Sequence, residues 1–142
     1  MQKYGISENY LAKYSVVAAK LQVTLYILRP REIIAFVSSN GHIPFRSWLW
    51  GLAEDAKRII LKRLDRVALG NFGDSKFLGE GVYEMRIDFG PGYRVYYALD
   101  GKTIVLLLSG GDKSTQVKDI KQAKEYWNEY QENKKSGNVS TL

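Results

Sequence analysis

The stretch GVYEMRIDFGPGYRVYYALDGKTIVLLLS, residues 81–109, decides the fold. It contains three short apolar runs, separated by the turn signals GPG (residues 90–92) and DG (residues 100–101). Short runs rich in valine, isoleucine and tyrosine, joined by tight turns, are typical of antiparallel strands. The stretch therefore predicts a three-stranded antiparallel meander.

Arginines interrupt the apolar pattern of the first two runs. Apolar side chains occupy positions 83, 85 and 87 of the first run and positions 93, 95, 97 and 99 of the second. Arg86 and Arg94 fall between them. Because successive side chains of a strand point to opposite faces of the sheet, each strand is expected to have one apolar face and one face with an arginine.

The third run ends abruptly in the polar segment SGGDKSTQ, residues 109–116. Glycine adopts backbone angles that are closed to other residues, so the sequence predicts a sharp turn at Gly110 and Gly111. A helix is expected to start near Thr115. A strand, a glycine turn and a helix start can expose backbone N–H groups to a phosphate, and the same arrangement is also an ordinary connection.

The rest of the chain supplies one more strand and three helices. EIIAFVSSNG (residues 32–41) is typical of a strand that ends in an Asn-Gly turn, and FRSWLWGL (residues 45–52) of a short helix. From about residue 53 to 69, and again after Thr115, apolar residues recur at helical spacing. The order β-α-α-β-β-β-α predicts an α+β fold of two layers, with two helices packed on one face of a small, mostly antiparallel sheet.

A single domain accounts for most of the 142 residues, a length sufficient for a hydrophobic core. We assign residues 25–132 to this domain. Residues 1–24 are only weakly patterned and are expected to form a loose N-terminal extension. The polar residues 133–142 are expected to form a mobile tail.

Composition excludes several kinds of site. The chain has no cysteine and a single histidine, His42, so disulfides, cysteine-based metal sites and sites built on two histidines are excluded. It has no P-loop, and no GxGxxG motif opens a helix. We therefore expect no metal and no small-molecule cofactor.

The charge balance favours a polyanionic partner. With 21 basic and 15 acidic residues the chain has a formal net charge of +6, an excess that suits nucleic acid or an acidic protein. No apolar run approaches the length of a transmembrane helix, and the N-terminus is a poor secretory signal. We expect a cytoplasmic protein that does not contact a membrane.

Four cations lie near the predicted meander: Lys76, Arg86, Arg94 and Lys113. Such a group suits a phosphodiester, whose transition state gathers negative charge on its non-bridging oxygens. The alternative is that each arginine forms a cross-strand ion pair, for example with the carboxylate at position 84 or 88.

Other residues are candidates for RNA binding. The ring of Tyr96 is suited to stack on an unpaired base, although tyrosines in strands are more often packed within the sheet. Basic stripes also follow the outer faces of the two long helices, with Arg58 and Lys62 on the first and Lys118 and Lys121 on the second. Such a stripe either contacts an anion or is a solvated surface.

Taken together, GNFGD (residues 70–74), GPGYRVYY (90–97) and GGDKSTQ (110–116) resemble the RelE/ParE superfamily of bacterial toxins. The most similar branch is that of the addiction-module killer proteins related to HigB. The resemblance runs from about residue 33 to residue 127 with no element missing. It implies a toxin that is neutralised by a cognate antitoxin and that cleaves mRNA, commonly in the ribosomal A site.

The resemblance also implies roles for the four cations. In such enzymes the 2′-hydroxyl attacks its adjacent phosphate, and basic residues act in place of a histidine pair. Lys76 would orient or deprotonate the 2′-hydroxyl. Arg86 and Lys113 would hold the scissile phosphate and stabilise its charge. Arg94 would do the same or would only brace the sheet.

Two other functions are compatible with the same resemblance. RelE-type nucleases often place a tyrosine or a histidine near the final helix, where this chain has Asp119. This departure leaves the proton-transfer chemistry open. ParE-like relatives share the fold and poison DNA gyrase without cutting RNA. A third possibility is an inactive module that binds RNA or the antitoxin.

Overall fold

The computed structural model describes residues 31–136. Residues 1–30, which include the expected N-terminal extension, and residues 137–142 of the expected tail lie outside them. The elements in chain order are β1 (Glu32–Ala35), α3 (Pro44–Trp50), α4 (Glu54–Ala68), β2 (Ser75–Gly79), β3 (Val82–Ile87), β4 (Tyr93–Asp100), β5 (Ile104–Asp112), the 3₁₀ turn η1 (Lys113–Thr115) and α5 (Gln116–Lys135).

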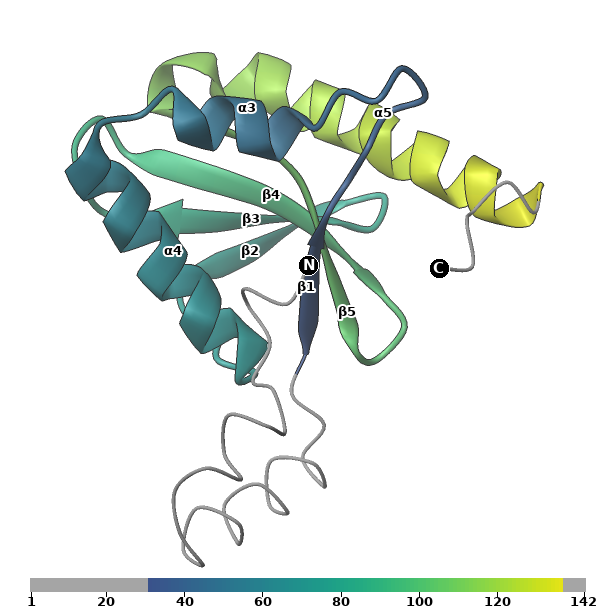
Figure 1. The fold of residues 1–142 in the computed structure, drawn as a ribbon, viewed down its shortest axis with the longest axis horizontal. Coiled ribbons are helices and arrows are strands. Elements are labelled where there is room, and N and C mark those ends of the chain that lie inside the picture. Colours follow the sequence, from purple (N-terminus) through teal and green to yellow (C-terminus); the bar gives the residue numbers. More distant parts are fainter. Residues whose placement is uncertain (1–30, 137–142) are drawn as a thin grey trace, which may run out of the picture.

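Five strands form one mixed sheet in the order β1-β5-β4-β3-β2. β1 is parallel to β5, and the other neighbours are antiparallel. Figure 1 shows the sheet between α4 on one side and α5 on the other. The predicted α+β fold with a mostly antiparallel sheet is confirmed, and the meander has one strand more than expected. β2 has the sequence SKFLG, whose lysine and terminal glycine weaken its strand signal.

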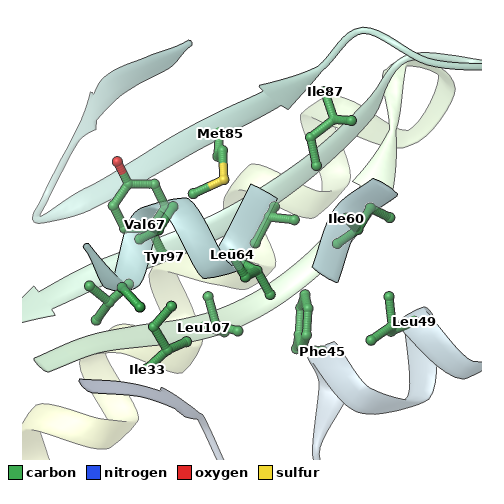
Figure 2. Packing of buried hydrophobic residues seen from close by; sticks show 13 residues of the cluster. Ile33, Phe45, Leu49, Ile60, Leu64, Val67, Met85, Ile87, Tyr97 and Leu107 are labelled. Atoms are coloured by element: carbon green, nitrogen blue, oxygen red, sulfur yellow. The ribbon is translucent and has the colours of Figure 1, made fainter. Parts of the chain in front are cut away.

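The larger core lies between the sheet and the helices α3 and α4 (Figure 2). Ile60, Leu64 and Val67 of α4 are completely buried against strand residues such as Met85 and Leu107. Two helices thus pack on one face of the sheet, as predicted. Pro44 begins α3 at a position where its missing N–H needs no partner, and the chain leaves the helix at Gly51.

Helix α5 covers part of the opposite face, which the sequence left open. A second, smaller core there includes Ala123 of α5 and the strand residues Leu106 and Leu108. The helix runs to Lys135, three residues past the predicted end of the domain at residue 132. Near its C-terminal end, the hydroxyl of Tyr130 and the ammonium of Lys134 both donate to Asp100 at the end of β4, at 2.6 and 2.7 Å.

This tether gives a pH-dependent prediction for Asp100→Asn. Burial alone would raise the pKa of Asp100, but hydrogen bonds from Lys134 and Tyr130 outweigh it and hold the pKa below its ordinary value of 3.8. The carboxylate therefore stabilises the fold above pH 3.8, and this contribution is lost as the pH falls through the lower folded-state pKa. Urea unfolding should show the variant less stable by about 1–3 kcal/mol at neutral pH. A deficit that stays the same in acid would contradict the assignment.

The expected turn at Gly110 and Gly111 is wrong. Both residues continue β5 and pair with Val95 and Arg94 of β4, and neither has a positive φ. Their missing side chains make room for neighbours instead. The ring of Trp48 occupies the space that a Cβ on Gly110 would need. On the other face, the carboxylate of Asp119 occupies the space beside Gly111.

Gly110→Ala is therefore expected to destabilise the protein, because the new methyl group must displace the Trp48 ring. Overpacking of this kind typically costs about 1–3 kcal/mol. Gly51→Ala is the matched control, since a Cβ there meets only ordinary contacts at 3.5 Å or more and the backbone is right-handed. Thermal unfolding measures the effect. Equal decreases in the melting temperature of the two variants would show that steric overlap is not the cause.

Candidate functional site

Arg86 and Arg94 lie directly opposite each other on β3 and β4. Side chains in such a pair project from the same face with Cβ atoms about 4.5–5.5 Å apart, and like charges placed there repel. This face of the sheet is the one that α5 partly covers. Each arginine has a carboxylate of its own, but the two carboxylates differ in their exposure to water.

Arg86 is paired with Asp74, which immediately precedes β2. Nη2 and Nε of Arg86 donate to the same oxygen, Oδ1, at 2.9 and 3.3 Å. The two side chains are 46% and 58% exposed, so water screens the attraction and an incoming anion can reach the guanidinium. The sequence offered Glu84 or Asp88 as ion-pair partners, and the structure gives Arg86 neither of them.

Arg94 is held more tightly. Its side chain is only 12% exposed, and Nη1 donates to the carbonyl oxygen of Gly92 at 2.6 Å. Nε lies 3.9 Å from Oε2 of Glu84, a carboxylate that is itself almost completely buried. The alternative that the sequence left open, an ion pair with Glu84, is thus present at Arg94.

Gly92, in the turn between β3 and β4, lies beside both Arg94 and Lys113. A Cβ placed on Gly92 would lie 2.9 Å from Nη1 of Arg94 and 3.8 Å from Cβ of Lys113, so Gly92 separates the two cations. Gly92 also has a φ of +79°, which favours glycine. Lys113 is exposed and opens η1, where Asp112 caps the turn by accepting from the backbone N–H of Ser114 at 2.8 Å. Hydrogen bonds from the Ser114 side chain and backbone lower the pKa of Asp112.

Lys76 lies on the edge strand β2, directly opposite Glu84. Glu84 and Arg86 are two residues apart on β3 and share a face, so Lys76 occupies the row of side chains beside the two arginines. Lys76, Arg86 and Arg94 therefore share one face of the sheet, and Lys113 follows the end of β5 next to Gly92. Lys76 and Lys113 are exposed.

Tyr96 is completely buried in the core beneath α5. Burial and the nearby charge of Glu84 raise the pKa of its hydroxyl. A base cannot stack on a ring that has no exposed surface, so the structure corrects the expectation that Tyr96 contacts RNA. The more common alternative, a tyrosine packed in the sheet, is the observed one.

The four helix cations are exposed but lie on two sides of the sheet. Lys118 and Lys121 belong to α5, which covers the face with the arginines. Arg58 and Lys62 belong to α4, on the opposite face. Arg58 and Lys62 are therefore separated from the four cations of the meander by the thickness of the sheet.

Arg63 supports the site and was missed in the sequence. From α4 it donates to the carbonyl oxygens of Phe72, Asp74 and Arg86, at 3.0, 3.2 and 2.9 Å. Burial lowers the pKa of its guanidinium. Arg63 thereby joins the backbones of the two residues whose side chains form the exposed ion pair. In the sequence, Arg63 is one of several basic residues of α4, and nothing there distinguishes it as a donor to these three carbonyl groups.

Two further features, a metal-ligand group and a membrane-spanning helix, are absent from the described part of the chain. Residues 31–136 contain no group of three or more metal-ligating side chains. In the same range, no helix is long and apolar enough to cross a membrane.

Fold and site together define a small, basic α+β protein with cations gathered on one sheet face. Residues 47–128, more than half of the chain, match the family described as phage-derived protein Gp49-like (DUF891). The chain belongs to this family, a RelE-like family of addiction-module killer proteins. Membership indicates the toxin of a toxin–antitoxin system, and with it an antitoxin partner.

One relative is an uncharacterised protein of Haemophilus influenzae. It is 53% identical over 83 residues, which cover 58% of this chain and 84% of that protein. No solved structure matches.

Proposed function

We propose that the protein is an mRNA interferase of the HigB-related branch: an endoribonuclease that cuts messages on the ribosome and is neutralised by a cognate antitoxin. The observation that carries the proposal is the direct opposition of Arg86 and Arg94, with Lys113 beside Arg94. Each arginine has its own carboxylate, but the Arg86–Asp74 pair is exposed to water. A phosphate that displaces Asp74 would meet Arg86, Arg94 and Lys113 together.

In the proposed reaction, the scissile phosphate lies against Arg86, Arg94 and Lys113. The 2′-hydroxyl of the preceding nucleotide loses its proton to water and attacks the phosphorus. The bond to the 5′-oxygen breaks, and that oxygen takes up a proton from water and leaves as a 5′-hydroxyl. The upstream fragment keeps a 2′,3′-cyclic phosphate. The three cations stabilise the negative charge that develops on the non-bridging oxygens. Lys76, one row away on β2, orients the attacking hydroxyl.

The exposed helix cations extend this site along the RNA. In this proposal Lys118 and Lys121, which are exposed on α5, contact the message beyond the scissile phosphate. Arg58 and Lys62 face the other way, so they would contact a polyanion only if it surrounds the domain, as ribosomal RNA does. Replacement of Arg58 and Lys62 by alanine should weaken binding to ribosomes, and the loss should depend on the salt concentration.

Expression in growing cells separates this function from gyrase poisoning. Induction of an mRNA interferase should arrest translation and produce new 5′ ends within translated messages. Induction together with the antitoxin, sought among the products of neighbouring genes, should restore growth and yield a complex. Double-strand DNA breaks and an SOS response with intact messages would instead identify a gyrase poison and would refute the proposal.

A further inference from the structure

Glu84 is an unusual residue for the interior of a sheet. It is 1% exposed, and within residues 31–136 it is the one charged residue among those classed as buried. Removing a carboxylate from water costs several kcal/mol unless charges and hydrogen bonds compensate it. An apolar side chain at this position would pack beneath α5 without that cost, so packing does not account for the carboxylate.

The contacts of Glu84 lead to Arg94. Its oxygen Oε2 accepts from the Nε2 amide of Gln116, the first residue of α5, at 2.7 Å. The same oxygen is 3.9 Å from Nε of Arg94. That Nε is buried and has no hydrogen-bond partner, so the charge of Glu84 is what stabilises this edge of the guanidinium. Nη1 is held separately by the carbonyl oxygen of Gly92.

The two arginines of the site are therefore held in different ways. The Arg86–Asp74 pair is exposed, and a phosphate can compete with Asp74 for the guanidinium. The Arg94–Glu84 pair lies under α5, with side chains only 12% and 2% exposed, so an incoming anion cannot displace Glu84. Arg94 keeps its counter-charge and its orientation when substrate arrives.

We propose that Glu84, locked by Gln116, is a positioning residue that fixes the Arg94 guanidinium for the scissile phosphate. The inference rests on the proposed function. A cation that is already oriented needs no rearrangement as charge develops in the transition state, so the benefit falls on kcat more than on KM. Burial, and after it the nearby charge of Glu84, raise the pKa of the neighbouring Tyr96 hydroxyl.

A double-mutant cycle of Glu84→Gln with Arg94→Gln tests the coupling. With purified protein and messages on translating ribosomes, Glu84→Gln should lower kcat by about 10–100-fold with little change in KM. It should cause no further loss in the Arg94→Gln background. Glu125→Gln, an exposed carboxylate on α5, is the matched control and should leave kcat unchanged. Equal losses in both backgrounds, or an unchanged kcat for Glu84→Gln, would overturn the proposal.

A second variant keeps the test valid if Glu84→Gln does not fold. Gln116→Ala removes only the hydrogen bond that holds the carboxylate, at the partly exposed start of α5. It should lower kcat to a smaller extent, and again only while Arg94 is present. A loss of the same size without Arg94 would count against the positioning role.

Hydrogen exchange at the Nε–H of Arg94 gives a readout that does not depend on RNA cleavage. In the wild-type protein this proton should exchange slowly, and exchange should accelerate in Glu84→Gln and Gln116→Ala. If the wild type cleaves no messages on translating ribosomes but the exchange pattern holds, the proposed function fails and the positioning of Arg94 stands. Exchange rates equal in all three proteins would show that Glu84 does not hold Arg94.

Discussion

Replacement of Arg86 by alanine is expected to slow message cleavage by about 10²–10³-fold, the loss typical when one electrostatic donor to a transition state is removed. The same loss is expected for Lys113→Ala. Both side chains are exposed, so neither substitution should disturb the core. Single-turnover cleavage of a message on the ribosome, with folding checked by circular dichroism, measures the effect.

Lys102→Ala is the matched control for both substitutions. It removes one exposed positive charge from the turn between β4 and β5. This turn follows the C-terminal end of β4, whereas Arg94 lies near the N-terminal end of that strand. Its cleavage rate should equal that of the wild type. If Arg86→Ala and Lys113→Ala remain folded and cleave as fast as Lys102→Ala, the site lies elsewhere, and the exposed ion pair of Arg86 with Asp74 only braces the sheet.

Leu64→Ala should have the largest effect on stability, with a loss of about 2–5 kcal/mol in the free energy of unfolding. Leu64 has no exposed surface and lies in the middle of the core between α4 and the sheet, as Figure 2 shows. Truncation leaves a cavity that rigid neighbours on the sheet cannot fill. Urea denaturation at neutral pH measures the loss.

Leu69→Ala provides the comparison for Leu64→Ala. Leu69 follows α4 directly and is 54% exposed, so its truncation removes the same atoms without opening a cavity. A change within about 0.5 kcal/mol is expected, as for ordinary surface substitutions. Similar losses for the two variants would mean that the packing seen around Leu64 is not what stabilises the domain.

The regular spacing of apolar residues along single helices and strands predicted which of their faces are buried. The helical spacing of Ala53, Ala56, Ile60, Leu64 and Val67 predicted the inner face of α4. The last four are buried, whereas Ala53 precedes the helix and is exposed. The alternation around Arg86 and Arg94 predicted that both arginines share one face, which the register of β3 and β4 confirms. These features depend on side-chain patterns of a single element, which a sequence displays directly.

Features that depend on contacts between distant elements were not predictable in the same way. The sequence predicts a turn at glycines 110 and 111, because the space that they leave for Trp48 and Asp119 matters only when α3 and α5 pack on β5. The partners of Arg86 and the clamp formed by Arg63 likewise require residues far apart in the chain to meet. Tyr96 is buried because α5 covers its face, which the strand pattern alone does not reveal.

The chemistry of the cleaved ends tests the central claim most directly. Translating ribosomes supplied with the purified protein should yield messages whose upstream fragments end in a 2′,3′-cyclic phosphate and whose downstream fragments begin with a 5′-hydroxyl. The yield should fall by about 10²–10³-fold with Arg86→Ala. Intact messages under these conditions, together with DNA breaks when the protein is mixed with DNA gyrase, would contradict the account.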